Sequence, residues 1–432
     1  MSSTDTRQAT QQTPISAPAL AASPTYRRRT TCRACGAAAL HCFLALGPQP
    51  LANAFPRDES DTAAEEFFPL DVCFCESCSL VQLADVIDPA VLFSNYIYVT
   101  GTSTTIAEHN ARYAQAVADR LALRPGDLVV EVASNDGSLL KHFQNHGATV
   151  LGVEPASNIA AMAVERGVPT DNRFFSHAVA TELRAKHGPA RAVIGNNVLA
   201  HVDAATDFLR GFAALLGSDG LGVVEVPYAR EMLERLEYDT IYHEHLCYFT
   251  VTSLARMAEA AGLAIAHVDR VPVHGGSLRV FLTCGGTHHD QARAVMREEH
   301  AIGLSDVATW RGWASSVERT RHELRLMLED LRGQGKRVVG YGAPAKGNTL
   351  LNYCRIDRTL VPYTVDKNPL KVGRLTPGMH IPVKSVETLA HDRPDYLLIL
   401  AWNFAAEIME QQSAYRAQGG RFIVPVPSPV II

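Results

Sequence analysis

The middle of the chain alternates short apolar runs with amphipathic stretches. The pattern predicts a strand over Leu128–Val132, then a loop of small and polar residues, then a helix from about Ser138. After Gly147, a second apolar run ends at Glu154 and predicts another strand. A strand, a helix and a second strand in this order form a β-α-β unit, so we expect a parallel sheet.

The same alternation continues further along the chain. The segments "AVIGNNVLAHV" and "LGVVEVPY" predict a fourth and a fifth strand. The segment "FTVTSLARMAEAAGL" predicts a helix with Thr252 near its N-cap and Gly262 at its end, because threonine often caps helix starts and glycine often ends helices.

The C-terminal third repeats this design. "RVVGYGAPAKGNTLLNYC" predicts a strand, a glycine-rich loop and a helix, a later strand ends at Asp366, and "DYLLILAWNFAAEIMEQQ" predicts another buried strand and helix. The loop around Lys346 is consistent with a second crevice of the nucleotide-binding kind. Glycine-rich turns also occur where a strand and a helix pack tightly and no ligand binds. Between the two units, residues 291–336 are charged and helically periodic, which predicts a helical connector.

Length and composition exclude several classes of protein. At about 100–200 residues per domain, 432 residues predict two to four domains. With 47% hydrophobic residues and a formal net charge of −5, we expect a protein that binds neither nucleic acid nor membrane. The cluster Arg27–Arg29 follows a small apolar patch, the wrong order for a secretory signal. We therefore expect a disordered tail over 1–25 and a cytoplasmic monomer.

The cysteines are concentrated near the N-terminus. Cys32 with Cys35, and Cys75 with Cys78, form two Cys-x-x-Cys pairs that could present four thiolates tetrahedrally to one zinc ion. The interval between the pairs is longer than in common zinc ribbons. Four thiolates leave no open coordination position, so we expect a structural zinc site. Because the rest of the chain resembles a reduced cytosolic protein, a disulfide framework is not expected.

Two further cysteines, Cys42 and Cys73, lie in the same stretch. On an extended strand, Cys73 would point the same way as Cys75 and is an alternative ligand, although the paired spacing favours the other four. The alternative to a zinc site is that these cysteines are scattered buried thiols that bind no metal.

The loop after the first central strand lacks the full Gly-x-Gly-x-x-Gly pattern. Its residues are Ala133, Ser134, Asn135, Asp136 and Gly137. Small residues still let the backbone approach a ligand, and an acidic residue such as Glu154 can accept hydrogen bonds from ribose hydroxyls. A structural loop without a ligand is the alternative.

The order of these central elements resembles the class I S-adenosylmethionine-dependent methyltransferase core. In that family, the acidic residue after the second strand holds the adenosyl ribose, which implies this role for Glu154. The first loop wraps the methionine part, which implies a cofactor border of Glu131, Ala133, Asn135 and Gly137. The segment "RFFS" implies that Phe174 or Phe175 packs on adenine, although either residue is also explained by the core.

The three parts together resemble the sugar C-methyltransferases of deoxysugar biosynthesis. The resemblance rests on the cysteine pairs, on "YHEHLCYF", "HGGSLR", "GYGAPAKGN" and "VDKNP", and covers residues 30–430. It implies an α/β protein with a small zinc-binding domain at 26–88, a Rossmann-like class I methyltransferase domain at 89–288, and a connector with a C-terminal Rossmann-like domain at 289–432. Members of the family use S-adenosylmethionine to methylate C3 of a nucleotide-linked 4-keto-6-deoxy sugar.

The family's Tyr-x-Glu-His pattern is present as Tyr242, Glu244 and His245, and His201 corresponds to its loop histidine. His243 lies outside the pattern and receives no role. Methylation at C3 first requires removal of the C3 proton, which the adjacent C4 ketone makes possible by delocalising charge onto oxygen. We assign the base to His245, since imidazole has a reference pKa of about 6.5. Tyr242 and His201 could then donate to the C4 oxygen, and Glu244 could orient a histidine or hold a sugar hydroxyl.

The resemblance also implies that the C-terminal crevice helps to bind the nucleotide sugar. Lys346 and Asn348 are the candidate residues there, and His274 is a candidate in "HGGSLR". Tyr96 and Tyr98 are candidates for the wall of the sugar pocket, although packing explains them equally well.

Two other functions fit fewer features. An O- or N-methyltransferase on the same core would need no acidic carbon, but it would not need a second α/β domain either. A non-catalytic zinc-ribbon binding or scaffold protein would be expected to carry a basic patch, and "RRRTTCRAC" is the only local candidate.

Overall fold

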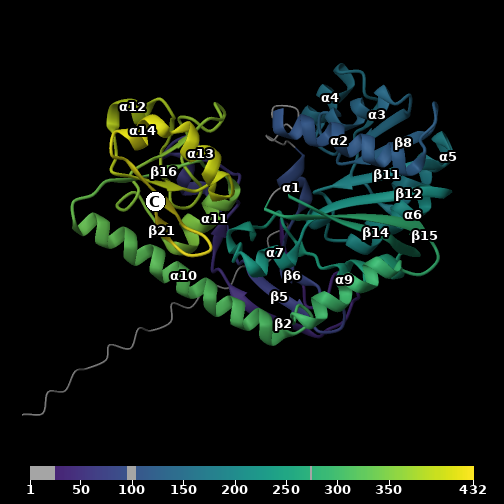
Figure 1. The fold of residues 1–432 in the computed structure, drawn as a ribbon, viewed down its shortest axis with the longest axis horizontal. Helices are drawn as coiled ribbons and strands as arrows, with labels where there is room; N and C mark the ends of the chain where they lie inside the picture. The colour runs from purple at the N-terminus through teal and green to yellow at the C-terminus, as the bar shows by residue number, and fades with distance from the viewer. Residues whose placement is uncertain (1–24, 95–103, 273–274) are drawn as a thin grey trace, which may run out of the picture.

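The computed structural model describes residues 25–94, 104–272 and 275–432, except for the side chains of 104–106. Figure 1 shows a central region and a C-terminal region beside one another, with N-terminal strands and the long helix α10 below both. Within the described ranges, no helix combines the length and the apolar character that crossing a bilayer requires.

The central region is built on a seven-stranded sheet with the order β10-β9-β8-β11-β12-β15-β14. Its first five strands in this order are parallel, whereas β15 runs antiparallel to both of its neighbours. The strands are Leu128–Val132 (β8), Thr149–Val153 (β9), Thr170–Asp171 (β10), Ala190–Asn196 (β11), Leu216–Pro227 (β12), Leu263–Val271 (β14) and Ser277–Cys284 (β15). The predicted β-α-β unit is confirmed, because α3 begins at Ser138 and joins β8 to β9.

Helices cover both faces of this sheet. Successive strand residues point to opposite faces, so Val129 and Ile194 pack in one core cluster while Val130 and Val193 pack in another. The first cluster contains residues of α2 (Thr104–Leu121), α3 (Ser138–Asn145) and α4 (Ser157–Glu165). The second contains residues of α5 (His177–His187), α6 (Ala205–Leu215), α7 (Ala229–Glu234) and α8 (Val251–Ala260).

The N-cap of α8 is Thr250 rather than Thr252. The Thr250 hydroxyl accepts the N–H of Ser253 at 3.0 Å, and the Ser253 hydroxyl accepts the N–H of Thr250 in return. This reciprocal pair is a capping box. Thr252 instead donates its hydroxyl to the buried carboxylate of Glu299 at 2.6 Å.

The N-terminal region contains a four-stranded sheet with the order β13-β6-β5-β2. Its own strands are Leu40–Ala45 (β2), Asp71–Cys75 (β5) and Val81–Leu83 (β6), and two further pairs join Tyr26–Arg28 (β1) to Asp85–Ile87 (β7) and Gln49–Pro50 (β3) to Phe67–Phe68 (β4). The fourth strand, Cys247–Tyr248 (β13), comes from the central part of the chain. The segment around "YHEHLCYF" is thereby fixed to the N-terminal sheet.

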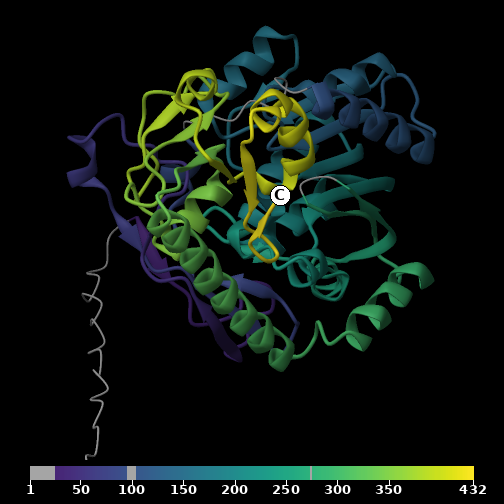
Figure 2. The same cartoon turned by 60° about the vertical axis from the view of Figure 1, so that its left-hand side comes forward.

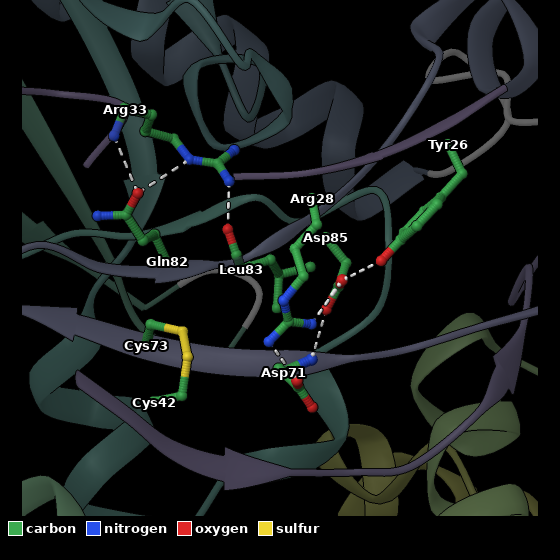
Figure 3. Close-up of a disulfide and its surroundings, with 9 residues drawn as sticks. All are labelled: Tyr26, Arg28, Arg33, Cys42, Asp71, Cys73, Gln82, Leu83 and Asp85. Carbon is green, nitrogen blue, oxygen red and sulfur yellow. Dashed lines mark hydrogen bonds and ion pairs between the residues drawn. A yellow bond between two sulfur atoms is a disulfide. The ribbon is translucent and has the colours of Figure 1, made fainter. Parts of the chain in front are cut away.

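A disulfide joins Cys42 to Cys73, which corrects the expectation against disulfides. The two residues face each other in register on the antiparallel strands β2 and β5, and sequence spacing does not reveal such a pairing. Cys73 is thereby excluded as an alternative metal ligand. Figure 3 shows this disulfide beside the polar contacts of the same region, including those of Tyr26 and Arg28 with Asp85.

The C-terminal region has a six-stranded sheet with the order β18-β17-β16-β19-β20-β21, parallel except for β21. Its strands are Val338–Tyr341 (β16), Thr364–Asp366 (β17), Val383–Ser385 (β18), Tyr396–Ile399 (β19), Arg421–Val424 (β20) and Val430–Ile431 (β21). Its helices are Ala345–Cys354 (α11), Thr388–Asp392 (α12), Ala405–Gln411 (α13) and Ser413–Ala417 (α14). The strands predicted to end at Asp366 and to lie in "DYLLIL" are confirmed.

The predicted helical connector consists of α9 (Asp290–Ala301) and α10 (Val307–Gly333). In Figures 1 and 2, α10 runs from the N-terminal strands to the C-terminal region. At its start, Trp310 and Trp313 place their rings 5.8 and 6.4 Å from the ring of Phe43 on β2. Towards its end, α10 packs on α11 and β16, so one helix braces two regions.

Candidate functional site

The loop between β8 and α3 has an unusual backbone. Ala133, Asn135 and Gly137 have positive φ angles of 53°, 48° and 73°. At Gly137 a Cβ atom would lie 2.8 Å from the side chain of Val168, so only glycine fits there. This tight path turns the loop over the carboxyl ends of the parallel strands, where α/β sheets bind ligands.

Glu154 follows β9 and closes this loop. Its two carboxylate oxygens accept the backbone N–H groups of Asn135 and Ala156, each at 2.9 Å. Burial raises the pKa of the carboxyl, and these two hydrogen bonds act in the opposite direction. A carboxylate has about four acceptor positions, so Glu154 can still accept bonds from a ribose.

The other predicted cofactor residues differ in exposure. Glu131 is buried on β8, burial raises its pKa well above the ordinary value, and its Oε2 atom has no hydrogen-bond partner among the described residues. Phe175 packs in the core, with its ring 5.3 Å from that of Phe208. Phe174 is 43% exposed, so it remains the aromatic candidate for adenine.

His245 lies at the centre of a polar group. Its Nδ1 atom lies 2.8 Å from the carbonyl oxygen of Thr240 at the end of η4 (Tyr238–Thr240), and its Nε2 atom lies 2.8 Å from the hydroxyl of Tyr242. Because a carbonyl only accepts, a neutral His245 carries its proton on Nδ1. Nε2 is then the basic nitrogen and accepts a hydrogen bond from the Tyr242 hydroxyl.

His201 completes this group from the other side. It ends η3 (Leu199–His201), which follows β11, and its ring lies 4.9 Å from that of His245 and 5.6 Å from that of Phe93, at the end of α1 (Pro89–Phe93). Burial lowers the pKa of His201 to about 4, so its imidazole is neutral near pH 7. Its Nδ1 atom is buried without a hydrogen-bond partner among the described residues.

Glu244 and His243 point to different surroundings. Glu244 is buried, and its Oε1 atom accepts the side-chain N–H of Asn53 at 2.6 Å. His243 packs against Phe68, with its Nε2 atom 3.0 Å from the carbonyl oxygen of Pro69. The structure therefore brings Tyr242 and His245 together with His201, binds Glu244 to Asn53 of the N-terminal region, and directs His243 towards Phe68 and Pro69 of the same region.

Lys346 lies between the central and C-terminal regions. Its Nζ atom is 3.9 Å from Oε2 of Glu237 and 5.8 Å from the ring centre of Trp402. Burial raises the pKa of Glu237 to about 7 despite this ammonium group. Asp239 is fully buried and accepts the indole N–H of Trp402 at 2.5 Å. Glu237 and Asp239 were not predicted as site residues; the two acidic residues of "EYD" are the local sequence signal that marks them.

The remaining predicted substrate residues have mixed outcomes. Asn348 is buried in α11 and donates its side-chain N–H to the carbonyl of Ala52 at 2.7 Å. Tyr96, Tyr98 and His274 lie outside the described residues.

Four thiols converge in the N-terminal region. The Sγ atoms of Cys32, Cys35, Cys75 and Cys78 all lie within 4.8 Å of one another, and the Cys32–Cys78 and Cys35–Cys75 distances are 3.5 and 3.7 Å. Tetrahedral zinc with Zn–S bonds of about 2.3 Å separates its sulfur ligands by about 3.8 Å, so the cluster fits this metal. Gln82 donates its side-chain N–H to the Sγ atom of Cys32 at 3.1 Å.

Comparisons with known proteins agree with this arrangement. Three family models match: "Putative zinc binding domain" over residues 32–93, "Methyltransferase domain" over 106–268 and "C-methyltransferase C-terminal domain" over 272–427. "C-methyltransferase NovU" of Streptomyces niveus is 40% identical over 404 residues, which cover 93% of this chain and 96% of that protein. The chain belongs to the C-methyltransferase family.

The C-methyltransferase is thus an S-adenosylmethionine-dependent enzyme with an N-terminal zinc-binding domain and a class I, Rossmann-like methyltransferase domain. Among solved structures, the magnesium protoporphyrin IX methyltransferase of Synechocystis with bound S-adenosylmethionine is 16% identical over 42% of this chain and 86% of that one, with a TM-score of 0.31. The CcbJ methyltransferase of Streptomyces caelestis is 16% identical over 41% and 90%, with a TM-score of 0.34.

Proposed function

We propose that this C-methyltransferase transfers a methyl group to C3 of a nucleotide-linked 4-keto-6-deoxy sugar, through an enolate formed by removal of the C3 proton. The strongest support is the group formed by His245, Tyr242 and His201, because it combines a basic nitrogen with neutral hydrogen-bond donors in a buried place.

The hydrogen bonds support a role for each of these side chains. The Thr240 carbonyl holds Nδ1–H of His245, so Nε2 faces the substrate and takes the C3 proton. The electron pair of the C–H bond moves towards the C4 oxygen. In the free enzyme the Tyr242 hydroxyl donates to Nε2, and on substrate binding it turns to donate to the C4 oxygen. His201, which is neutral at working pH, is the second donor to this oxygen.

The cofactor supplies an electrophilic methyl group on sulfur. Glu154 holds the ribose, and the loop residues Ala133, Asn135 and Gly137 border the methionine part together with Glu131. Phe174 packs on the adenine. These assignments are supported by the positions of the residues near the carboxyl ends of β8, β9 and β10.

The nucleotide part of the substrate is placed between the central and C-terminal regions. Lys346 and the N-terminus of α11 attract the diphosphate, since cations and helix N-termini both favour anions. Asn348 remains a proposed contact of the substrate: its Nδ2 is bound to the carbonyl of Ala52, whereas its buried Oδ1 has no hydrogen-bond partner among the described residues. Tyr96, Tyr98 and His274 remain proposed contacts of the sugar.

The four clustered cysteines are proposed as the zinc ligands. Together they leave no coordination position for substrate, so zinc holds the N-terminal region in shape and takes no part in the transfer.

The test is to incubate the protein with ¹³C-methyl S-adenosylmethionine and a thymidine-diphosphate- or guanosine-diphosphate-linked 4-keto-6-deoxyglucose. Carbon-13 magnetic resonance should locate the new methyl group on C3. The C4 ketone also acidifies the hydrogen at C5, so a label on C5 would retain the enolate but overturn the assignment to C3. A label on oxygen, or no transfer with either sugar, would contradict the proposal.

A further inference from the structure

A loop of the N-terminal region reaches the candidate catalytic residues. Residues 51–56 follow β3 and turn at once, since the N–H of Ala54 donates to the carbonyl of Leu51 at 3.0 Å. The amide of Asn53 leaves this turn and lies 2.6 Å from Oε1 of Glu244, which is 191 positions away in the sequence. Glu244 neighbours His245 in the chain and is buried.

The same loop is fixed to the C-terminal region on both sides of Asn53. Before it, the carbonyl of Ala52 accepts the side-chain N–H of Asn348 at 2.7 Å. After it, the carbonyl of Pro56 accepts the N–H of Leu375 at 2.9 Å. The ring of Phe55 is buried in a small cluster with Ala343 and Val383. The backbone that carries Asn53 is therefore held in place independently of Glu244.

We propose that Asn53 is a positioning residue for the reaction: its amide fixes the carboxylate of Glu244 in the orientation that the substrate meets. This inference rests on the proposed function and on the role expected for Glu244 from the Tyr-x-Glu-His pattern, which is to orient a histidine or to hold a sugar hydroxyl. An ionised carboxylate only accepts hydrogen bonds, so the amide presents Nδ2 to it. An amide is also uncharged, so it orients the carboxylate and leaves its negative charge in place. A lysine ammonium group in the same position would neutralise that charge.

The contact gives the zinc-binding region a direct part in the active site. The adjacent residues Ala52 and Asn53 bind Asn348 of the C-terminal region and Glu244 of the central region, respectively. All three regions meet at this turn.

Two substitutions separate a donor role from a packing role. Asn53→Asp keeps the size and shape of the side chain but replaces the donor by a negative charge beside Glu244, whereas Asn53→Ala removes the amide. We expect kcat/KM to fall roughly tenfold or more in Asn53→Ala, the loss of one hydrogen bond to a charged group, and to fall further in Asn53→Asp. A residue that merely fills space would give the reverse order.

The pH profile adds a readout that packing would not change. As pH falls, the carboxyl introduced by Asn53→Asp takes up a proton and can donate again, so its activity relative to the wild type should rise. Asn53→Ala cannot recover in this way. Arg374→Ala is the matched control, because it removes a side-chain bond to the carbonyl of Phe55 in the same loop and leaves Asn53 and Glu244 intact. Its pH profile should match that of the wild type.

A measurement without substrate distinguishes failure of this inference from failure of the proposed function. The carboxyl ¹³C resonance of Glu244, identified by its loss in Glu244→Gln, is titrated in labelled protein. Asn53→Ala should raise the pKa of Glu244, because a donor to the charged form is lost. A wild type that methylates neither sugar would refute the proposed function, and the titration would still decide on Asn53. An unchanged pKa of Glu244, or an Asn53→Asp enzyme as active as the wild type, would overturn the inference.

Discussion

The sheets of the central and C-terminal regions share a unit of strand, loop and helix (β8–α3 and β16–α11), and each region places a carboxylate at the end of the next strand, Glu154 directly after β9 and Asp366 as the last residue of β17. Glu154 accepts the N–H of Asn135 in the first loop at 2.9 Å, and Asp366 accepts the N–H of Ala343 in the corresponding loop at 2.6 Å. Both carboxylates therefore tie the first loop to the second strand by the same hydrogen bond.

The two loops differ in what covers them. Near the central loop, Glu131 has a buried oxygen without a partner among the described residues. In the C-terminal loop, the carbonyl of Ala343 already accepts Nζ of Lys371 at 2.8 Å, and Phe55 of the N-terminal region packs on Ala343. We infer that the loop after β8 serves cofactor binding, whereas the corresponding loop after β16 serves docking of the N-terminal region.

If the N-terminal region covers the second loop, loss of its metal should have the largest effect. Cys75→Ser removes one of four thiolates from a site type that supplies about 10–16 kcal/mol of binding free energy, so zinc content and soluble yield should both fall sharply. Cys42→Ser breaks the disulfide but leaves all four clustered thiols, and it should retain one zinc per chain. Elemental analysis of protein purified without added metal measures both, and a folded wild type without zinc would contradict the assignment.

Phe55→Ala should have the next largest effect. Its buried ring fills the contact with the C-terminal loop, so truncation should lower the free energy of unfolding by about 3–5 kcal/mol. Affinity for S-adenosylmethionine should stay close to that of the wild type. Urea denaturation and calorimetric titration test the two statements, and a loss of cofactor affinity without a loss of stability would reverse the roles that we give to the loops.

Smaller effects are expected when Glu154 and Asp366, the corresponding carboxylates of the two regions, are each replaced by alanine. Glu154→Ala should weaken binding of S-adenosylmethionine by about 1.5–3 kcal/mol, or roughly tenfold to over a hundredfold. Asp366→Ala leaves the N–H groups of Ala343 and Asn368 without their acceptor, so it should cost about 1–3 kcal/mol of stability and leave cofactor affinity unchanged. Equal cofactor affinity in Glu154→Ala and the wild type would break the comparison.

Local patterns predicted the scaffold well. The strand expected over Leu128–Val132 coincides with β8, and the helix expected from Ser138 coincides with α3. Both follow from apolar periodicity and loop composition, which act over a few residues. The paired spacing of the four cysteines likewise predicted a cluster that the structure contains.

The contacts that join the regions could not be predicted from the sequence. The disulfide depends on the register of β2 against β5, and Asn53 meets Glu244 only because a loop docks on two other regions. Thr240 acts through a carbonyl group that every residue has, so no side-chain signal marks it. Such contacts are properties of the packed fold, whereas the Tyr-x-Glu-His pattern is local.

The central claim is that His245 removes the C3 proton. In heavy water, with S-adenosylhomocysteine in place of the methyl donor, magnetic resonance of the 4-keto sugar should show exchange of the C3 hydrogen in the wild type. His245→Ala should reduce this exchange and methylation by about 10²–10⁴-fold while both ligands still bind, because it removes a base and leaves the binding residues. His243→Ala, which alters the neighbouring buried histidine, should exchange like the wild type per folded molecule. Exchange at the wild-type rate in His245→Ala would contradict the account.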